Sequence, residues 1–138
     1  MKGAVATTQL SGSCLCGAVR FDVNGAFDAF YLCHCSRCRK DTGSAHAANL
    51  FARQAELKWK AGGDAVRTFK LPGTRHAKAF CSSCGSALPF MGEGFVVVPA
   101  GSLDGDAARK PQAHLFAGSR ASWDHDLEQL PAFESLPT

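Results

Sequence analysis

The sequence predicts an all-β fold with little helix, and three observations lead to that prediction. Short runs in which polar and apolar residues alternate recur along the 138 residues, and Gly, Pro and Asn separate them. No stretch keeps a helical period over the roughly 12 residues that a helix of ordinary length needs. Seven cysteines stand in tight groups, which is typical of a small β protein held together by metal.

The length and composition fit one domain. A chain of 138 residues can bury ~70% of its unfolded surface, whereas two half-length domains would each need extra staples. Apolar residues make up 46% and charged residues 20% of the chain, as in ordinary globular proteins. We expect residues 1–10 to be a flexible lead-in and residues 11–138 to form a single domain.

The first expected strands surround the central cysteines. Ala18–Val23 alternates with a period of two, so we expect a strand that ends in a turn at Asn24–Gly25. The apolar runs Phe30–Leu32 and Ala45–Ala52 lead into and out of the cysteine-rich segment 33–38. Both runs are expected to be strands.

The second half of the chain is expected to add further strands. Glu56–Lys60 and Val66–Lys70 alternate and flank Gly62–Asp64, which predicts a hairpin. The only helical segments expected are one turn at Cys35–Thr42 and a short acidic stretch at Ser122–Leu130. Three more strands are expected, at His76–Phe80, Phe95–Val98 and Ala113–Phe116.

We expect a cytoplasmic protein with no membrane segment. Residues 1–13 contain a single Lys and no apolar run of the length that a signal peptide needs. The most hydrophobic stretch, Phe95–Ala100, falls well short of the ~18 apolar residues that cross a bilayer. In a reducing cytoplasm, the tight C-x-C and C-x-x-C spacings and the odd number of cysteines indicate metal ligation rather than disulfides.

Four cysteines have the spacing of a closed zinc site. Zinc with four thiolates needs a tetrahedron of sulfurs at about 2.3 Å, usually supplied by two short chelating turns. Cys14-x-Cys16-Gly17 and Cys81-x-x-Cys84-Gly85 are such turns, and the glycine after each lets the backbone curl back towards the sulfurs. We therefore expect a structural zinc that ties the first strand to a central one. Its ligands would be Cys14, Cys16, Cys81 and Cys84.

Cys33, Cys35 and Cys38 form a second group that is close enough to bind one ion. No fourth sulfur accompanies them, and three protein ligands with an open position are typical of a catalytic zinc. Two alternatives stay open: His34, His46 or another residue fills the fourth position, or the trio is reduced and empty. The expectation is two zinc ions per chain, of which the second is the more labile.

The charge of this second group favours a thiol as its exogenous ligand. Zn²⁺ with three thiolates is anionic, so it activates water poorly and suits a soft thiolate. Arg37, Arg39 and Lys40 would offset the negative charge and attract an acidic thiol such as glutathione, although a solvated basic face is the alternative for each. His34 and His46 are candidate substrate-binding or proton-donating residues because of their nearness in the sequence.

The same residues resemble a known family, the glutathione-dependent formaldehyde-activating enzymes, which includes centromere protein V. The resemblance covers about Ser11 to Pro137 and rests on three cysteine motifs and the C-terminal part of the chain. The matching residues are Gly12-Ser13-Cys14-x-Cys16-Gly17 with Val19 and Phe21, Cys33-His34-Cys35-Ser36-x-Cys38-Arg39-Lys40-x-Thr42-Gly43-Ser44, Phe80-Cys81-x-x-Cys84-Gly85-Ser86, His114-Leu115-Phe116, Ala121-x-Trp123 and Leu130-Pro131-x-Phe133.

The resemblance implies a β-tent of antiparallel sheets, a structural zinc on the first four cysteines and a catalytic zinc on Cys33, Cys35 and Cys38. It further implies that glutathione and formaldehyde combine near the second metal to give S-hydroxymethylglutathione, a reaction of the carbon–sulfur lyase class. We therefore expect a zinc enzyme that adds a small thiol to formaldehyde or another small electrophile, or releases the thiol from it.

The alternative is a non-catalytic zinc-binding module whose basic patch at residues 37–40 binds an acidic protein or nucleic acid. The formal charge is +3, but seven thiolates and two Zn²⁺ would lower the net charge to about zero. Basic and aromatic residues are not interleaved around the patch, so nucleic acid is not the expected partner. We expect the strand at Phe95–Val98 to lie either in the core or at a sheet edge that pairs with a second copy in a homodimer.

Overall fold

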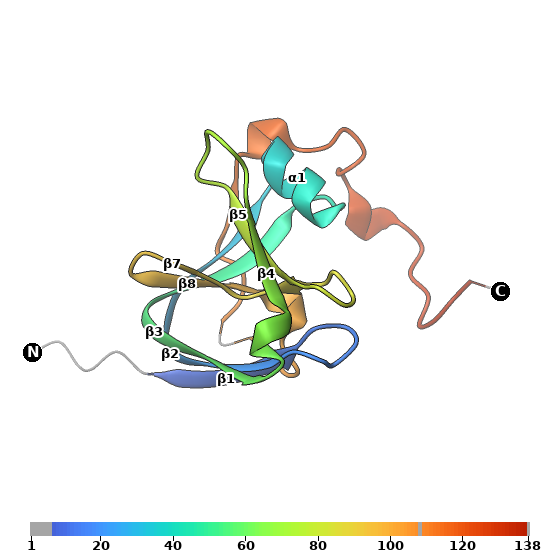
Figure 1. Ribbon diagram of the computed structural model, residues 1–138. Helices are drawn as coiled ribbons and strands as arrows, with labels where there is room; N and C mark the ends of the chain where they lie inside the picture. Colours follow the sequence, from blue (N-terminus) through green and yellow to red (C-terminus); the bar gives the residue numbers. More distant parts are fainter. Residues whose placement is uncertain (1–6, 108, 138) are drawn as a thin grey trace, which may run out of the picture.

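The computed structural model describes residues 7–107 and 109–137, which form two β-sheets and one short α-helix (Figure 1). The larger sheet holds β1 (Thr8–Ser13), β2 (Arg20–Cys33), β3 (Ala47–Ala61), β7 (Phe90–Gly92), β8 (Phe95–Pro99) and β9 (Ala113–Leu115). The smaller sheet holds β4 (Val66–Lys70), β5 (Ala77–Cys81) and β6 (Ala87–Leu88). The helical segments are α1 (Ser36–Thr42) and the 3-10 turns η1 (Gly63–Ala65), η2 (Ala100–Ser102), η3 (Ala117–Ser119) and η4 (Leu127–Gln129). No helix in the described ranges is long and apolar enough to cross a membrane.

Almost all of the strand pairs are antiparallel, so the predicted all-β fold with little helix is confirmed. Along the larger sheet the order is β1, β2, β3, β8 and β7. Strand β9 lies parallel to the end of β2, where it pairs with residues 31–33. The smaller sheet has the order β4, β5 and β6, and Figure 1 shows α1 at the upper end of the molecule, beside the β4–β5 hairpin.

Strands β2 and β3 form the longest pair, and their pairing corrects one prediction. It runs from Arg20 to Cys33 and contains three register shifts. Asn24–Gly25 lies at one of these shifts, so the predicted turn there is wrong and β2 continues through it. A Cβ on Gly25 would lie 2.7 Å from the Cβ of Ala55, which explains why a glycine occupies this irregular position.

The predicted hairpin between Glu56–Lys60 and Val66–Lys70 is also wrong, although both segments are strands. The first belongs to β3 and pairs with β2, whereas the second is β4 and pairs with β5 in the smaller sheet. The chain changes sheets at Gly62, which has a φ of 69° and lies so close to the carbonyl oxygen of Ala18 that a Cβ has no room. Alternation predicts a strand here but does not predict its partner.

The ends of the chain bring two further corrections. Residues 8–10, expected within a flexible lead-in, begin β1 and pair with residues 23–25, so the lead-in prediction is wrong for them. Residues 1–6 lie outside the described residues. Ser122–Leu130 contains the 3-10 turn η4 rather than an α-helix. The strands expected at His76–Phe80, Phe95–Val98 and Ala113–Phe116 are confirmed to within one residue.

The apolar core is continuous with one of the cysteine groups. Phe21, Leu50 and Val98 are at most 1% exposed, and each such side chain contributes about 1.5–3 kcal/mol through burial. Cys14 and Cys81 belong to the same buried cluster. A metal bound by these two thiols would therefore be anchored directly in the core.

Candidate metal centres

The first cysteine cluster, made up of Cys14, Cys16, Cys81 and Cys84, joins the two sheets. Its sulfurs come from the β1–β2 loop of the larger sheet and from the end of β5 and the loop after it in the smaller sheet. All four Sγ atoms lie within 4.8 Å of one another, with 3.6 Å between Cys14 and Cys16 and 4.0 Å between Cys16 and Cys81. A tetrahedral zinc with sulfurs at 2.3 Å separates them by roughly 3.8 Å. The donor set therefore fits a closed tetrahedral metal site.

Both loops of the first cluster direct backbone N–H groups at sulfur. The N–H of Val19 donates to Cys14 Sγ and the N–H of Ser83 donates to Cys81 Sγ, each at 3.3 Å. Gly17 has a φ of 80°, a left-handed conformation that lets the loop turn back within a few residues. Hydrogen bonds of this kind stabilise a thiolate, which is the form that binds metal.

Ser86 links the two loops of the first cluster. Its Oγ accepts a hydrogen bond from the N–H of Leu15 at 2.9 Å and lies 3.3 Å from Cys84 Sγ. Because the oxygen already accepts from Leu15, the hydroxyl proton is free to point at the sulfur. The hydrogen bonds from the side chain and backbone of Ser86 lower the pKa of Cys84 to about 5. This thiol is therefore ionised at neutral pH, which is the form that binds metal.

The second cysteine cluster, Cys33, Cys35 and Cys38, forms where β2 gives way to α1. Cys33 is the last residue of β2, Cys35 caps the N-terminus of α1, and Cys38 lies in its first turn. Their Sγ atoms also lie within 4.8 Å of one another. All three side chains are partly exposed. In the part of the chain that the structure describes, no fourth His, Cys, Asp or Glu joins this group.

Two thiols of the second cluster have pKa values that are shifted in opposite directions. Burial opposes ionisation of Cys35, but the N–H of Cys38, at 3.3 Å from Cys35 Sγ, and the neighbouring thiols lower the pKa of Cys35 overall. Burial, together with Cys35 and Cys33, raises the pKa of Cys38. Without a metal the cluster therefore keeps a proton on Cys38 and favours the thiolate at Cys35.

The three basic residues predicted to bind the substrate, Arg37, Arg39 and Lys40, lie on two different faces of α1. With 3.6 residues per turn, Arg39 falls on the same face as Cys35. Arg37 and Lys40 fall on the opposite face, where they line a groove of about 260 Å³ with Phe69. None of the ion pairs among the described residues involves Arg37 or Lys40.

His34 points away from the sulfurs on either side of it and into a polar network. Its side chain is 1% exposed, with Nε2 lying 2.8 Å from His114 Nδ1 and Nδ1 lying 3.4 Å from Asp124 Oδ2. Arg120 Nε approaches the same Asp124 oxygen at 3.5 Å. Burial lowers the pKa of His34, and the positive charge of Arg120 lowers it further. His34 is therefore a neutral, enclosed group rather than a metal ligand.

Comparison with known proteins places the chain in a family. Residues 9–119 match the family described as "Glutathione-dependent formaldehyde-activating enzyme". This range contains every cysteine of both clusters. The chain belongs to the glutathione-dependent formaldehyde-activating enzyme family. The resemblance seen in the cysteine motifs is thereby confirmed.

A relative supports this membership, and a solved structure shares the fold. A protein of Halomonas elongata, named "Putative glutathione-dependent formaldehyde-activating enzyme", is 35% identical over 128 residues, which cover 83% of this chain and 78% of the relative. A crystal structure of a Rhodobacter sphaeroides protein has a TM-score of 0.58 at 26% identity and covers 76% of this chain and 99% of that one. The fold of this family member is therefore shared with a solved structure.

Three residues of this family member that surround His34 were not predicted as site residues. Sequence reasoning noted His114 only as part of the C-terminal motifs and did not single out Arg120 or Asp124. All three lie about 80 residues or more along the chain from His34. The register of β9 beside β2, in which His114 is opposite Leu32, brings the segment back to the second cluster. No local pattern in the sequence predicts that register.

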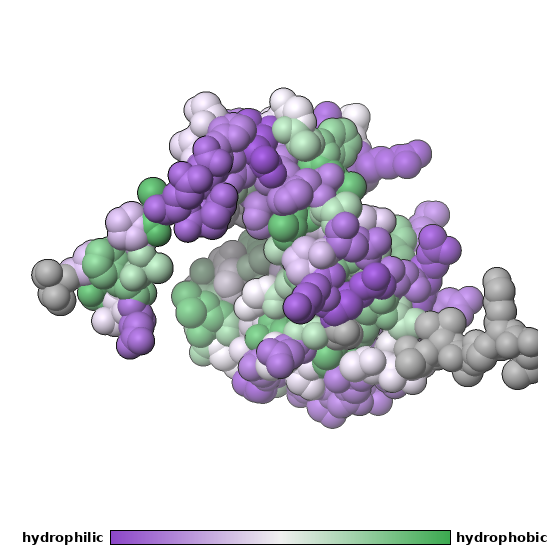
Figure 2. Space-filling model, turned by 180° about the vertical axis from the view of Figure 1, so that it is seen from behind, coloured by the Kyte–Doolittle hydropathy of each residue, from purple (hydrophilic) through white to green (hydrophobic). Residues whose placement is uncertain are grey.

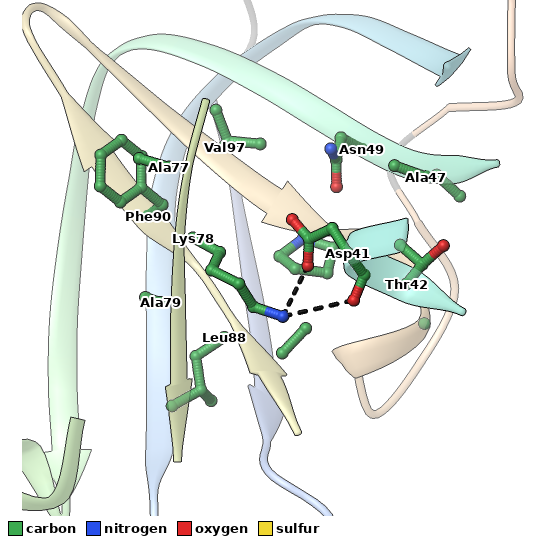
Figure 3. A pocket seen from close by; sticks show the side chains of 14 residues that line it. Asp41, Thr42, Ala47, Asn49, Ala77, Lys78, Ala79, Leu88, Phe90 and Val97 are labelled. Carbon is green, nitrogen blue, oxygen red and sulfur yellow. Dashed lines mark hydrogen bonds and ion pairs between the residues drawn. The ribbon is translucent and has the colours of Figure 1, made fainter. Parts of the chain in front are cut away.

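A cavity of about 200 Å³ lies between the sheets of this family member, beneath α1 (Figure 3). Its wall is mostly apolar and includes Ala47, the residue opposite Cys33 in the β2–β3 pair. Asp41 closes one side, because its carboxylate binds Lys78 Nζ at 2.6 Å and His76 Nε2 at 2.7 Å. These contacts fix the end of α1 to the smaller sheet, and the dashed lines in Figure 3 mark the two that Lys78 makes, with the carboxylate and with the carbonyl oxygen of Asp41.

Proposed function

We propose that this family member is a zinc-dependent enzyme of carbon–sulfur bond chemistry that combines a small thiol, glutathione or a close analogue, with formaldehyde. The observation behind the proposal is the second cluster. Three partly exposed cysteine sulfurs converge at the start of α1 without a fourth protein ligand among the described residues, which is the donor set of an open zinc site. The family and the name of the Halomonas elongata relative support glutathione and formaldehyde as substrates.

The proposal includes two zinc ions with different tasks. In the first cluster four sulfurs would hold a structural ion, and in the second cluster three sulfurs would hold a catalytic ion with one position free. Zinc at the second cluster would supply a Lewis acid that keeps a substrate thiol deprotonated at neutral pH. In the reaction the sulfur bonds to the carbonyl carbon, the carbonyl π pair moves to oxygen, and the oxygen takes up a proton. The product is an S-hydroxymethyl thioether.

The polar side chains near the second cluster take separate roles in the proposal. Arg39, on the Cys35 face of α1, attracts the anionic substrate and stabilises negative charge on the carbonyl oxygen. His46, whose ring packs edge-on against His34 at 5.1 Å, is the proposed proton donor. Arg37 and Lys40 lie on the far face of the helix, so they would meet only the carboxylates of a peptide-sized thiol that extends around α1. His34 is enclosed, so its role is to position its neighbours.

A cytoplasmic location is part of the same proposal. All seven cysteines are free of disulfides. Metal binding requires reduced, ionised thiols, and the cytoplasm maintains thiols in that state.

The test of the proposed function combines a metal count with turnover. Native mass spectrometry under reducing conditions counts zinc, and NMR follows S-hydroxymethylglutathione formation against the uncatalysed rate. We expect two zinc ions and a clear acceleration in the wild type. Cys35→Ser should lose the acceleration and the second zinc but keep the fold, because serine is a good helix N-cap and can replace Cys35 in accepting from the N–H of Cys38.

Ser36→Ala is the matched control for Cys35→Ser. Ser36 is exposed and is the next residue along the chain, so both metals and the acceleration should be retained. A wild-type protein that carries two zinc ions and gives only the uncatalysed rate would overturn the proposed function.

One observation favours a second function, a module that binds an acidic partner. Arg37 and Lys40 line the groove beside half-exposed Phe69 and take part in none of the ion pairs of the described residues. A partner bound there would be released as salt rises. If the double variant Arg37→Ala, Lys40→Ala loses such binding and keeps normal turnover, the groove serves a partner rather than the substrate.

A further inference from the structure

The side chains of Cys33, His34 and Cys35 point to two sides of the chain, one that carries the metal-ligating sulfurs and one that is buried. In extended backbone, successive side chains point to opposite sides, so the two cysteines reach the second cluster while His34 is directed inward. The imidazole is 1% exposed. The polar groups nearest to both ring nitrogens come from one distant segment, in which His114 forms a hydrogen bond with Nε2 and the Asp124 carboxylate faces Nδ1 without a hydrogen bond.

That segment, residues 113–124, is called the docking segment below. It holds the main chain as well as the side chain of His34, because the N–H of His34 donates to the carbonyl oxygen of Leu115 at 2.9 Å. The imidazole meets His114 at 2.8 Å and Asp124 at 3.4 Å. His34 is thus held by two hydrogen bonds, and the Asp124 carboxylate faces its third polar atom, all from residues that follow it by about 80 positions or more.

The end of the docking segment is itself held in place. Ala121 is 6% exposed, and its carbonyl oxygen accepts from the N–H of Asp124 at 3.0 Å. The Asp124 side chain is 12% exposed, and the carboxylate oxygen that faces His34 is also approached by Arg120 Nε at 3.5 Å. Asp124 therefore has little freedom to turn away from His34.

We propose that Asp124 is a positioning residue for the second cluster, acting through His34 on the Cys33–Cys35 turn, so that the docking segment sets how firmly this cluster retains a metal. The inference rests on metal binding by the second cluster, as in the proposed function. The first cluster has no contact of this kind with the docking segment, since its loops are held by Ser86 and by backbone N–H groups. Metal retention should therefore depend on Asp124 at one cluster only.

The experiment measures zinc loss from the holoprotein to an excess of a colorimetric chelator. We expect two phases, a fast one from the second cluster and a slow one from the first. Asp124→Ala should speed the fast phase about tenfold, the lower end of the effect of losing a group that directly orients a metal ligand, because Asp124 acts through His34, and it should leave the slow phase unchanged. Asp124→Asn should lie closer to the wild type, because asparagine has the same shape and keeps an oxygen that can face His34 and Arg120.

Glu128→Ala is the matched control, because it removes an exposed carboxylate from the same part of the chain. It should leave both phases unchanged. An unchanged fast phase in Asp124→Ala would overturn the proposal. So would acceleration of both phases together, or an equal change in Glu128→Ala, since these results would reflect general destabilisation or charge alone.

Amide hydrogen exchange of the metal-free protein separates this inference from the proposed function. Asp124→Ala should raise exchange in residues 33–36 by about tenfold and leave residues 14–19 unchanged. If the wild type carries only one zinc ion, the proposed function fails, and the exchange comparison still decides whether Asp124 holds the turn. Equal exchange at residues 33–36 in wild type and variant would overturn the positioning role.

Discussion

The two cysteine clusters use the same ligand atom but differ in what surrounds it. The first cluster has four sulfurs, of which two belong to buried residues, one to a partly exposed residue and one to an exposed residue. The second has three partly exposed sulfurs at a strand–helix junction. A closed tetrahedron suits a structural ion, and an incomplete one leaves room for an exogenous ligand. The number of sulfurs therefore separates the two roles.

The clusters also differ in the parts of the fold that they connect. The first joins a loop of the larger sheet to the end of β5 in the smaller sheet. The second lies within one short stretch of chain, and the docking segment contacts that stretch through His34. Losing the first metal should therefore weaken the connection between the sheets, and losing the second should alter only a local turn.

The largest effect is expected for Cys81→Ser. Cys81 is completely buried, and a structural zinc contributes directly to the folding free energy of its domain. We expect Cys81→Ser to unfold at a much lower urea concentration than the zinc-loaded wild type when denaturation is followed by circular dichroism. Ser83→Ala, at an exposed position in the same loop, should unfold like the wild type. A wild-type transition in Cys81→Ser would mean that the first cluster has no structural task.

The sequence predicts this division of the cysteines but not the support of the second cluster. The spacings Cys14-x-Cys16 and Cys81-x-x-Cys84 are local, and a chelating turn needs only local geometry. Asp124 becomes a neighbour of His34 through long-range packing and the pairing of β9 with β2. The hairpin predicted at residues 56–70 is wrong for the same reason, since an alternating pattern in the sequence does not determine which strands pair.

A smaller, pH-dependent effect is expected for Ser86→Ala in the metal-free protein. The folded protein holds the pKa of Cys84 near about 5, below its ordinary value of 9.0, chiefly through Ser86. A lowered pKa in the folded state stabilises the fold above the unfolded pKa, and this stabilisation is lost as pH falls through 5. The difference in free energy of unfolding between wild type and Ser86→Ala should therefore grow from pH 5 to pH 9.

Urea denaturation at several pH values measures this difference. Loss of the hydrogen bond from Leu15 to Ser86 adds a constant that does not vary with pH, so only the slope is diagnostic. Ser83→Ala again serves as the control and should show no slope relative to the wild type. A flat difference between pH 5 and pH 9 for Ser86→Ala would show that the hydroxyl does not stabilise the Cys84 thiolate.

The smallest effect is expected for deletion of residues 127–138. Leu130, Phe133 and Leu136 are 61%, 63% and 82% exposed, and Figure 2 shows apolar side chains along a C-terminal segment that stands clear of the body. Side chains that bury so little surface contribute little to stability, so the melting temperature and both phases of zinc loss should stay at wild-type values. Deletion of residues 120–138, which also removes Arg120 and Asp124, should speed only the fast phase.

The two deletions also test whether the exposed apolar side chains serve a second copy of the chain. If a homodimer covers them, the shorter deletion should lower the melting temperature in a way that depends on protein concentration, and analytical ultracentrifugation should show a loss of mass. If the shorter deletion instead speeds zinc loss at constant mass, residues 127–137 support the second cluster from within the same chain. That result would extend the docking segment beyond Asp124 and leave the first cluster, with its four sulfurs, as the only metal centre independent of the C-terminal part of the chain.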